Sequence, residues 1–186
     1  MIGAPRFGIS RRLLPLAPLM LAFLPAAALA QQAGPPIAIT RFQGKVVPPV
    51  TVSDRSGKPI RLADLRGRIV IVNMWATWCG PCRAEMPTLE SLAARYQKDL
   101  VVLAVSNDEG GWPDVDQFWK TQFPHLRVAL PSNPDLAVRL GAIGLPYSLI
   151  VDREGREIAR VPRGADWIHG ELAALIARSV SQPTKG

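Results

Sequence analysis

The stretch from Val70 to Pro87 constrains the fold more than any other part of this sequence. It begins as an apolar run rich in β-branched residues, which predicts a fully buried strand, and it ends by opening a helix. Cys79 and Cys82 lie at this junction and are the only cysteines of the chain. The first turn of a helix leaves backbone N–H groups unpaired and carries a partial positive charge, and both effects favour a thiolate at Cys79. Pro81 fits the same turn, where a missing N–H costs little, so the stretch predicts a reactive dithiol.

The residues around the two cysteines match a known pattern. The sequence Trp-Ala-Thr-Trp-Cys-Gly-Pro-Cys at positions 75–82 resembles the active site of the thioredoxin superfamily. With Asn73 before it and Arg-Ala-Glu-Met-Pro at positions 83–87 after it, the longer motif resembles the TlpA-like and ResA-like thiol–disulfide oxidoreductases of the bacterial cell envelope. The resemblance spans residues 50–179 and implies a thioredoxin-like fold of the α/β class.

The order of the predicted elements agrees with that fold. Strands are expected at residues 50–52, 60–62, 69–75, 100–105, 126–130, 147–151 and 157–161, the first two forming an N-terminal β-hairpin. Helices are expected at residues 79–97, 115–122 and 134–140, and a last amphipathic helix is expected after Asp166, which would be its N-cap. Strands and helices in this order predict a central mixed β-sheet with helices on both faces.

Three regions are expected along the chain. Residues 1–30 carry three arginines, then an uncharged apolar run, and end in Ala-Leu-Ala, which predicts a signal peptide cut after Ala30. An uncleaved membrane anchor is the alternative, although three prolines in the apolar run disfavour a regular spanning helix. Residues 31–49 are rich in Gly, Pro and Gln and predict a linker, and residues 50–182 predict the thioredoxin-like domain. In both alternatives the domain is expected outside the cytoplasm, in the periplasm.

The charge of the chain does not favour nucleic-acid binding. The formal charge is +7, with 22 basic and 15 acidic residues. Without the three arginines of residues 1–30, the surplus of positive charge falls to four, and the remaining basic residues form no dense run. A mildly basic, solvated surface is therefore the preferred interpretation. Contact with a membrane is expected only if the N-terminal segment stays uncleaved.

Cys79 and Cys82 allow three interpretations. A structural disulfide would close so small a loop that it restrains the unfolded chain little. A zinc site needs about four ligands, and His125 and His169, which are the only histidines, lie at no metal-binding spacing from the cysteines. The preferred interpretation is redox catalysis, in which the Cys79 thiolate attacks a substrate disulfide and Cys82 resolves the mixed disulfide. This interpretation requires no cofactor and no metal.

Glu85 is the third candidate catalytic residue. In thioredoxins the position of Asn73 holds a buried aspartate that helps to move the proton of the second cysteine, but asparagine cannot titrate. Glu85 lies three residues after Cys82, on the same face of the expected helix, and the resemblance places a glutamate here near the thiols. Burial would raise its pKa and let it exchange a proton near neutral pH. The alternative is a solvated glutamate or a partner in a salt bridge.

The resemblance also implies a substrate-binding surface. It places a cis peptide bond between Leu145 and Pro146, opposite the dithiol, where the backbone could pair with an extended substrate segment. Trp78, Gly80 and Pro81 complete the candidate substrate-binding residues. Trp75 and Trp78 are expected to border the substrate groove, whereas three other tryptophans are expected to be core or surface anchors: Trp112, Trp119 and Trp167. Both histidines are expected to be structural or exposed.

These features predict an extracytoplasmic thiol–disulfide oxidoreductase that works mainly as a reductant, because the Gly80–Pro81 pair occurs in reducing members of the superfamily. The resemblance implies that it reduces cysteines of apocytochromes or of metal sites in envelope proteins. Electrons would come from a dithiol carrier in the membrane. The alternatives are a disulfide-forming oxidant of the same fold, a copper-binding assembly chaperone and a peroxidase of the peroxiredoxin type.

Overall fold

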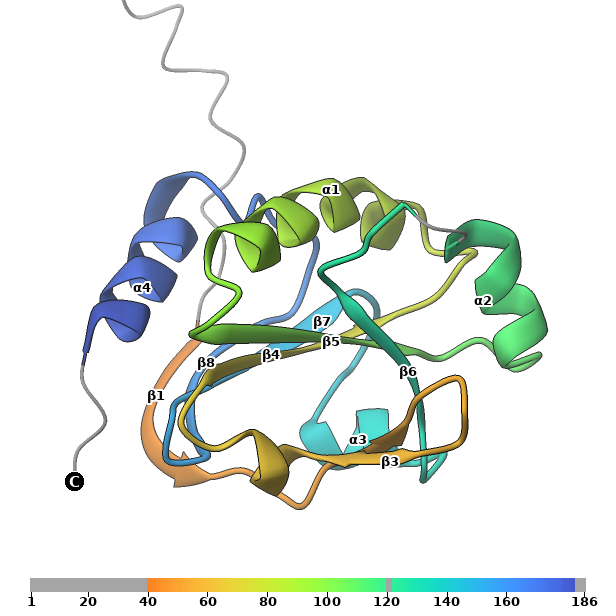
Figure 1. The fold of residues 1–186 in the computed structure, drawn as a ribbon, viewed down its shortest axis with the longest axis horizontal. Coiled ribbons are helices and arrows are strands. Elements are labelled where there is room, and N and C mark those ends of the chain that lie inside the picture. The colour runs from red at the N-terminus through yellow and green to blue at the C-terminus, as the bar shows by residue number, and fades with distance from the viewer. Residues whose placement is uncertain (1–39, 120–121, 183–186) are drawn as a thin grey trace, which may run out of the picture. The chain divides into compact units, whose positions relative to one another are not determined.

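The computed structural model describes residues 40–119 and 122–182, which form an eight-stranded mixed sheet with helices packed on it (Figure 1). The order of the strands is β1-β8-β7-β4-β5-β6-β2-β3. Their bounds are β1 Thr40–Val46, β2 Thr51–Ser53, β3 Pro59–Arg61, β4 Ile69–Trp75, β5 Leu100–Ser106, β6 Arg127–Pro131, β7 Tyr147–Val151 and β8 Arg156–Val161. The thioredoxin-like fold expected from the sequence is confirmed. The expected signal peptide at residues 1–30 lies outside the described residues.

The centre of the sheet consists of the two strands with the most apolar sequences. β4 and β5 run parallel in register from Ile69 beside Leu100 to Trp75 beside Ser106, and every residue of both strands is buried. β6 continues the parallel part, whereas β7 and β8 are antiparallel to β4 and to each other. The dithiol follows the carboxyl end of β4, the site at which many α/β proteins place their functional groups.

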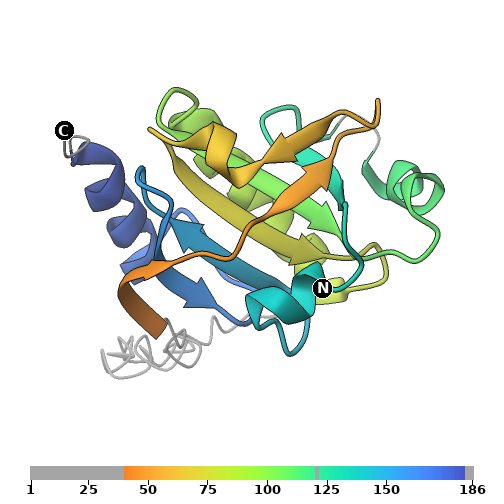
Figure 2. The same ribbon diagram turned by 90° about the horizontal axis from the view of Figure 1, so that it is seen from below.

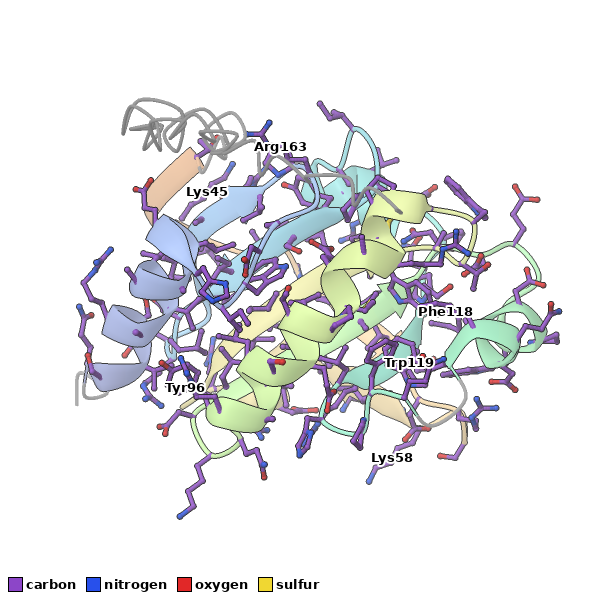
Figure 3. The ribbon with its side chains drawn as sticks, turned by 90° about the horizontal axis from the view of Figure 1, so that it is seen from above. Lys45, Lys58, Tyr96, Phe118, Trp119 and Arg163 are labelled. Carbon is purple, nitrogen blue, oxygen red and sulfur yellow. A yellow bond between two sulfur atoms is a disulfide. The ribbon has the colours of Figure 1, made fainter. Side chains whose placement is uncertain are left out.

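In the described part of the chain, four α-helices cover the sheet, and their bounds are α1 Gly80–Arg95, α2 Trp112–Trp119, α3 Leu136–Leu140 and α4 Gly170–Ser181. Alternate side chains of β4 enter two separate cores. Ile71 and Trp75 enter the core under α1, α2 and α4, and Val72 and Met74 enter the core on the side of α3 and the β2–β3 hairpin. Figure 3 shows the face of the sheet that α1, α2 and α4 cover, and Figure 2 shows the face with α3 and the hairpin. Among the described residues, no helix is long and apolar enough to cross a membrane.

α1 begins where the sequence predicted. Cys79 is its N-cap residue, Pro81 lies in its first turn, and the helix continues through Pro87. Its sheet-facing side carries Cys82, Glu85, Met86, Leu89, Leu92 and Ala93, all of them buried. The spacing of three and four residues keeps these side chains on one face, so Glu85 is placed between the helix and the sheet rather than in solvent.

Two expectations about the ends of elements are wrong. The expected linker at residues 31–49 contains β1, which pairs antiparallel with β8 and closes one edge of the sheet. The sheet therefore begins at Thr40 rather than at residue 50. Asp166 is not the N-cap of α4, because the helix begins at Gly170 and His169 is its N-cap residue. The Asp166 carboxylate instead accepts a hydrogen bond of 3.0 Å from the backbone N–H of Ile168, as in a local turn.

Arg153, in the turn between β7 and β8, ties together the end of the sheet opposite the dithiol. Its guanidinium donates hydrogen bonds to the carbonyl oxygen of Gly67, to the carboxylate of Asp99 and to the carbonyl oxygen of Val180. Val180 lies in the last turn of α4, whose carbonyl groups have no partner within the helix. A single side chain, 12% exposed, thus fixes the carboxyl end of α4 to the sheet.

Candidate active site

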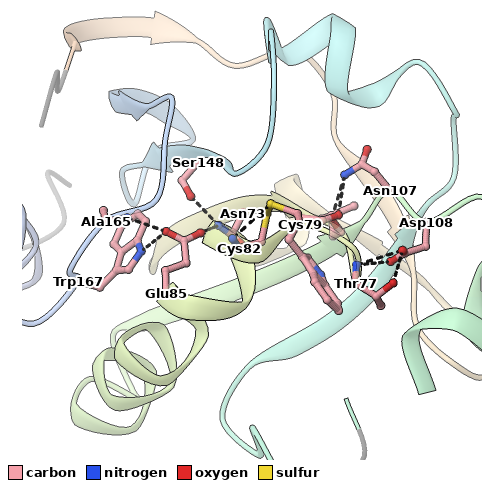
Figure 4. The surroundings of a disulfide bond; sticks show 12 residues. Asn73, Thr77, Cys79, Cys82, Glu85, Asn107, Asp108, Ser148, Ala165 and Trp167 are labelled. Carbon is pink, nitrogen blue, oxygen red and sulfur yellow. Dashed lines mark hydrogen bonds between the residues drawn. A yellow bond between two sulfur atoms is a disulfide. The ribbon is translucent and has the colours of Figure 1, made fainter. Parts of the chain in front are cut away.

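Cys79 and Cys82 form a disulfide at the start of α1 (Figure 4). The Cα atoms of Cys79 and Cys82 are 5.3 Å apart, and Cys79 Sγ accepts a hydrogen bond of 3.3 Å from the backbone N–H of Cys82. After reduction, a thiolate at Cys79 would accept a stronger bond here and would meet the positive end of α1. Cys79 is 5% exposed and Cys82 is fully buried. Cys79 is therefore the cysteine that a substrate can reach.

Asp108, which follows β5, fixes the backbone just before Cys79. The backbone N–H of Thr77 donates to both oxygens of the Asp108 carboxylate at 3.0 Å, and the Thr77 hydroxyl donates to it at 2.7 Å. The hydroxyl of Ser106 donates to the same carboxylate at 2.6 Å. The carboxyl end of β5 thus holds the loop that leads from β4 to the dithiol, as Figure 4 shows.

The Glu85 carboxylate is buried one helical turn after Cys82, and only 3% of the residue is exposed. Its Oε1 accepts a hydrogen bond of 2.8 Å from Asn73 Nδ2. Its Oε2 accepts bonds from the backbone N–H of Ala165 at 3.0 Å and from Trp167 Nε1 at 3.1 Å. Burial raises the pKa of Glu85 to about 7, and the three hydrogen bonds oppose that rise. The carboxyl group is buried, so the alternative of a solvated glutamate is wrong, whereas its role in exchanging a proton stays a prediction.

Asn73 links Glu85 to β7. Asn73 and Ser148 are paired in the register of β4 with β7, so their side chains lie opposite each other on the same face. Asn73 Nδ2 donates to Ser148 Oγ at 2.9 Å as well as to Glu85. Among the described residues, Asn73 Oδ1 has no hydrogen-bond partner, although it is buried. The amide therefore carries one unused acceptor beside the carboxyl group.

The peptide bond between Leu145 and Pro146 is cis, as expected. Pro146 directly precedes β7, whose first residue pairs with Met74 near the end of β4. A Cβ atom placed on Gly164 would lie 3.4 Å from the carbonyl oxygen of Pro81 and 3.7 Å from Cγ of Pro146. The dithiol loop, the cis proline and the segment before Ala165 therefore meet at one place.

Several residues expected to bind substrate have exposed side chains. Trp78 is 71% exposed and Ile143, two residues before Leu145, is 95% exposed. Gly80 and Pro81 are also exposed, and Leu145 is half-buried. An open groove of about 320 Å³ lies beside Trp78, between the dithiol loop and α2. Of the residues expected to bind substrate, Trp78, Gly80 and Pro81 are therefore accessible, whereas Pro146 is buried.

The expectation for Trp75 is wrong. Trp75 is fully buried and packs against Phe118 and Trp119, with ring centroids 5.5 Å and 5.3 Å away. It is the last residue of β4, so the alternation of the strand directs its side chain into the core, whereas Trp78 lies in the loop. Trp119 is a core residue, as expected, and Trp112 lies under the guanidinium of Arg55, 4.9 Å from its ring centroid.

The histidines pair with carboxylates away from the disulfide. His125 Nδ1 contacts the Glu90 carboxylate, which also accepts from the backbone N–H of His125. His169 Nδ1 lies 2.8 Å from the carboxylate of Asp166. Among residues 40–119 and 122–182, no three side chains of His, Cys, Asp or Glu are grouped so that they could hold a metal ion.

Three residues of the site escaped prediction from the sequence. Ser148 could have been found, because the alternation of β7 places it on the same face as Asn73. Asp108 carried a weaker signal, since it is a carboxylate just past the end of a buried strand. Trp167 carried none: its contact with Glu85 joins residues 82 positions apart across a loop with no regular pattern.

Comparison with known proteins places this fold and site in a family. Residues 43–160, more than half of the chain, match the AhpC/TSA family. The thiol–disulfide oxidoreductase ResA of Bacillus thuringiensis is 34% identical over 119 residues, covering 63% of this chain and 68% of that protein. The thiol:disulfide interchange protein HelX of Rhodobacter capsulatus is 32% identical over 165 residues, covering 85% and 91%.

Solved structures agree. The thioredoxin domain of a thiol–disulfide oxidoreductase from Bacteroides vulgatus superposes with a TM-score of 0.60 at 27% identity, over 76% of this chain and 100% of that one. A thio-disulfide isomerase from Thermus thermophilus gives a TM-score of 0.61 at 25% identity, over 76% and 98%. With its disulfide-bonded Cys79 and Cys82 and its thioredoxin-like fold, this chain belongs to the AhpC/TSA family and is a thiol–disulfide oxidoreductase similar to ResA and HelX.

Proposed function

We propose that this enzyme reduces disulfides of envelope proteins outside the cytoplasm. The observation that carries the proposal is the buried Glu85 carboxyl, whose pKa of about 7 lets it take up a proton one turn from Cys82. A reductant must release the proton of its second thiol during each turnover, and Asn73 cannot accept it.

The proposed reaction starts from the dithiol. The Cys79 thiolate attacks a substrate disulfide, forming a mixed disulfide and releasing one substrate thiolate. Cys82 then gives its proton to the Glu85 carboxylate, and the Cys82 thiolate attacks Cys79 Sγ. This step forms the intramolecular disulfide and releases the second substrate thiolate, so two electrons pass to the substrate. A membrane dithiol carrier is the proposed electron donor that restores the dithiol.

The proposed substrates are cysteine-bearing apocytochromes or metal-site proteins under assembly. The support is the resemblance of the motif around Cys79 to envelope oxidoreductases. The exposed side chains of Trp78 and Pro81 suit an extended substrate segment that pairs with the backbone before Pro146. Such pairing depends on the backbone of the substrate, so it tolerates different sequences.

Trapping of mixed disulfides tests the proposal. The Cys82→Ser variant retains the attacking thiolate but cannot resolve the intermediate, so it should accumulate mixed disulfides with apocytochromes or metal-site proteins of the envelope. The matched Cys79→Ser variant should trap few partners. Equal trapping by both variants would show that the assignment of the two cysteines is wrong.

The direction of electron flow needs a second measurement. Equilibration of the dithiol against a glutathione buffer should give a reduction potential well below the roughly −120 mV of the strong oxidant DsbA. Insulin reduction should be faster than peroxide turnover, and the purified domain should take up no copper. A potential near that of DsbA, with secreted proteins becoming oxidised, would reverse the proposed direction.

A further inference from the structure

The hydrogen-bonding partners of Glu85 fit only one of its two protonation states. All three partners donate: Asn73 Nδ2, the backbone N–H of Ala165 and the indole Nε1–H of Trp167. A carboxylate accepts such bonds, but a protonated carboxyl group also has an O–H that needs an acceptor. The N–H groups of Ala165 and Trp167 can never accept. The carboxyl group nevertheless has a pKa of about 7, so both states are populated near neutral pH.

Asn73 is the partner that can supply the missing acceptor. Its Oδ1 is buried and has no hydrogen-bond partner among the described residues. A half-turn of the amide about its last side-chain bond exchanges Oδ1 and Nδ2 without changing the shape of the side chain. After that rotation, Oδ1 would occupy the position of Nδ2, which lies 2.8 Å from Glu85 Oε1.

Ser148 is suited to both orientations. Its hydroxyl now accepts from Asn73 Nδ2 at 2.9 Å, and the same hydroxyl can donate to Oδ1 after the rotation. The register of β4 with β7 keeps Ser148 directly opposite Asn73, and both residues are buried. In either orientation, one end of the amide has no partner among the described residues. The state of Glu85 therefore decides which orientation is more stable.

We propose that Asn73 and Ser148 form a two-position hydrogen-bond switch that presents Nδ2 to the Glu85 carboxylate and Oδ1 to the Glu85 carboxylic acid. Both residues are positioning residues, because they act on the reaction through Glu85. The switch builds on the proposed role of Glu85 as proton acceptor, but its test requires only that Glu85 titrates. It lets a buried carboxyl group exchange its proton without leaving that proton unpaired.

Charged neighbours do not account for the behaviour of Glu85. Arg163 and Asp166 lie on the segment that carries Ala165, and Tyr147 lies next to Ser148 in β7. Burial raises the pKa of Glu85, the three hydrogen bonds oppose that rise, and no charged neighbour contributes. In the oxidised protein the cysteines do not titrate, so the disulfide form isolates the titration of Glu85.

Nuclear magnetic resonance of the oxidised full-length protein tests the switch. The side-chain carboxyl carbon of Glu85 and the side-chain amide of Asn73 are followed on both sides of pH 7. We expect the Asn73 amide resonances to shift with the same midpoint as Glu85. The nuclear Overhauser contacts from the Nδ2 protons to Ser148 should be present at high pH and lost at low pH. Contacts that persist unchanged through the titration of Glu85 would overturn the proposal.

Two controls make the result specific. The Asn107 amide donates to the carbonyl oxygens of Trp75 and Val105, so its resonances should not follow the midpoint of Glu85. In Glu85→Gln, the pH dependence at Asn73 should disappear. If Asn73 titrates equally in that variant, it responds to another group and the switch is wrong.

Variants of Ser148 test the second half of the switch. Ser148→Ala removes the acceptor for the second Nδ2 hydrogen of Asn73. A buried N–H without an acceptor costs more free energy than a buried carbonyl oxygen without a donor. The midpoint of Glu85 should therefore move to higher pH, and Ser148→Thr, which keeps the hydroxyl, should restore it. An unchanged midpoint in Ser148→Ala would remove Ser148 from the switch. Trapping by Cys82→Ser does not depend on this result, so the two proposals fail separately.

Discussion

Asp108 is the residue that fixes the backbone before Cys79. Replacing it with alanine leaves the Thr77 N–H and hydroxyl and the Ser106 hydroxyl without their acceptor. We expect Asp108→Ala to lower the free energy of unfolding by about 1–3 kcal/mol and to slow alkylation of Cys79. Asp108→Asn keeps one acceptor oxygen and should be intermediate. Urea unfolding and alkylation of the reduced protein measure both effects, and parental values in Asp108→Ala would contradict this role.

Glu85 should make stability depend on pH. Its pKa is raised from 4.5 to about 7 by folding, so between these values the folded protein holds a proton that the unfolded chain has lost. The free energy of unfolding should therefore fall as pH rises through this window, by on the order of 3 kcal/mol in total. Glu85→Gln should lack this slope and should also change the pH profile of thiol alkylation. Parallel pH profiles for parent and variant would reduce Glu85 to a structural residue.

At the scale of single residues, the sequence predicted those features of the site that depend on neighbouring positions in the chain. The spacing of Glu85 from Cys82 is fixed by the helix, and burial follows from the apolar pattern around it. The hydrogen bonds to Trp167 and Ser148 depend on how distant segments pack, which no local pattern encodes. Trp75 was predicted wrongly for another reason. Its place in the motif suggested that it borders the substrate groove, whereas its position in β4 directs its side chain into the core.

At the scale of elements, α4 depends on Arg153 for its attachment. Arg153→Ala removes three hydrogen bonds to Gly67, Asp99 and Val180, and we expect a loss of about 1.5–3 kcal/mol in the free energy of unfolding. Arg153→Lys replaces two guanidinium nitrogens, which bind at different positions, with one ammonium nitrogen and should recover only part of the loss. Hydrogen exchange should accelerate mainly in the last turn of α4, and uniform acceleration across the sheet would contradict a local attachment.

The elements that prediction missed are those with weak local signals. β4 and β5 are continuous apolar runs and were predicted nearly to the residue. β1 contains polar residues and Gly44, and its pairing with β8 joins segments more than a hundred residues apart. The start of α4 was placed too early because Asp166 has the chemistry of a cap but uses it in a turn.

At the scale of the whole molecule, the sheet sets the limit for processing of the N-terminus. We propose that export removes residues 1–30, so that the mature chain starts at Gln31. Thr40 begins the first strand of the described part of the chain, so cleavage after Ala30 leaves every described strand intact. N-terminal sequencing of envelope material should read Gln31, and the cleaved and full-length forms should unfold at the same temperature. Retention of Met1–Ala30 in the membrane fraction would favour an anchor instead.

The contact of Trp167 with Glu85 also gives the enzyme an optical property. The indole Nε1 lies 3.1 Å from a carboxyl oxygen that gains and loses its charge near neutral pH, and the ring is fully shielded from water. Indole emission responds to the electric field across the ring, so we expect protonation of Glu85 to shift the emission of Trp167. Trp167, 82 positions from Glu85 in the sequence, would then report optically on the proton beside the disulfide.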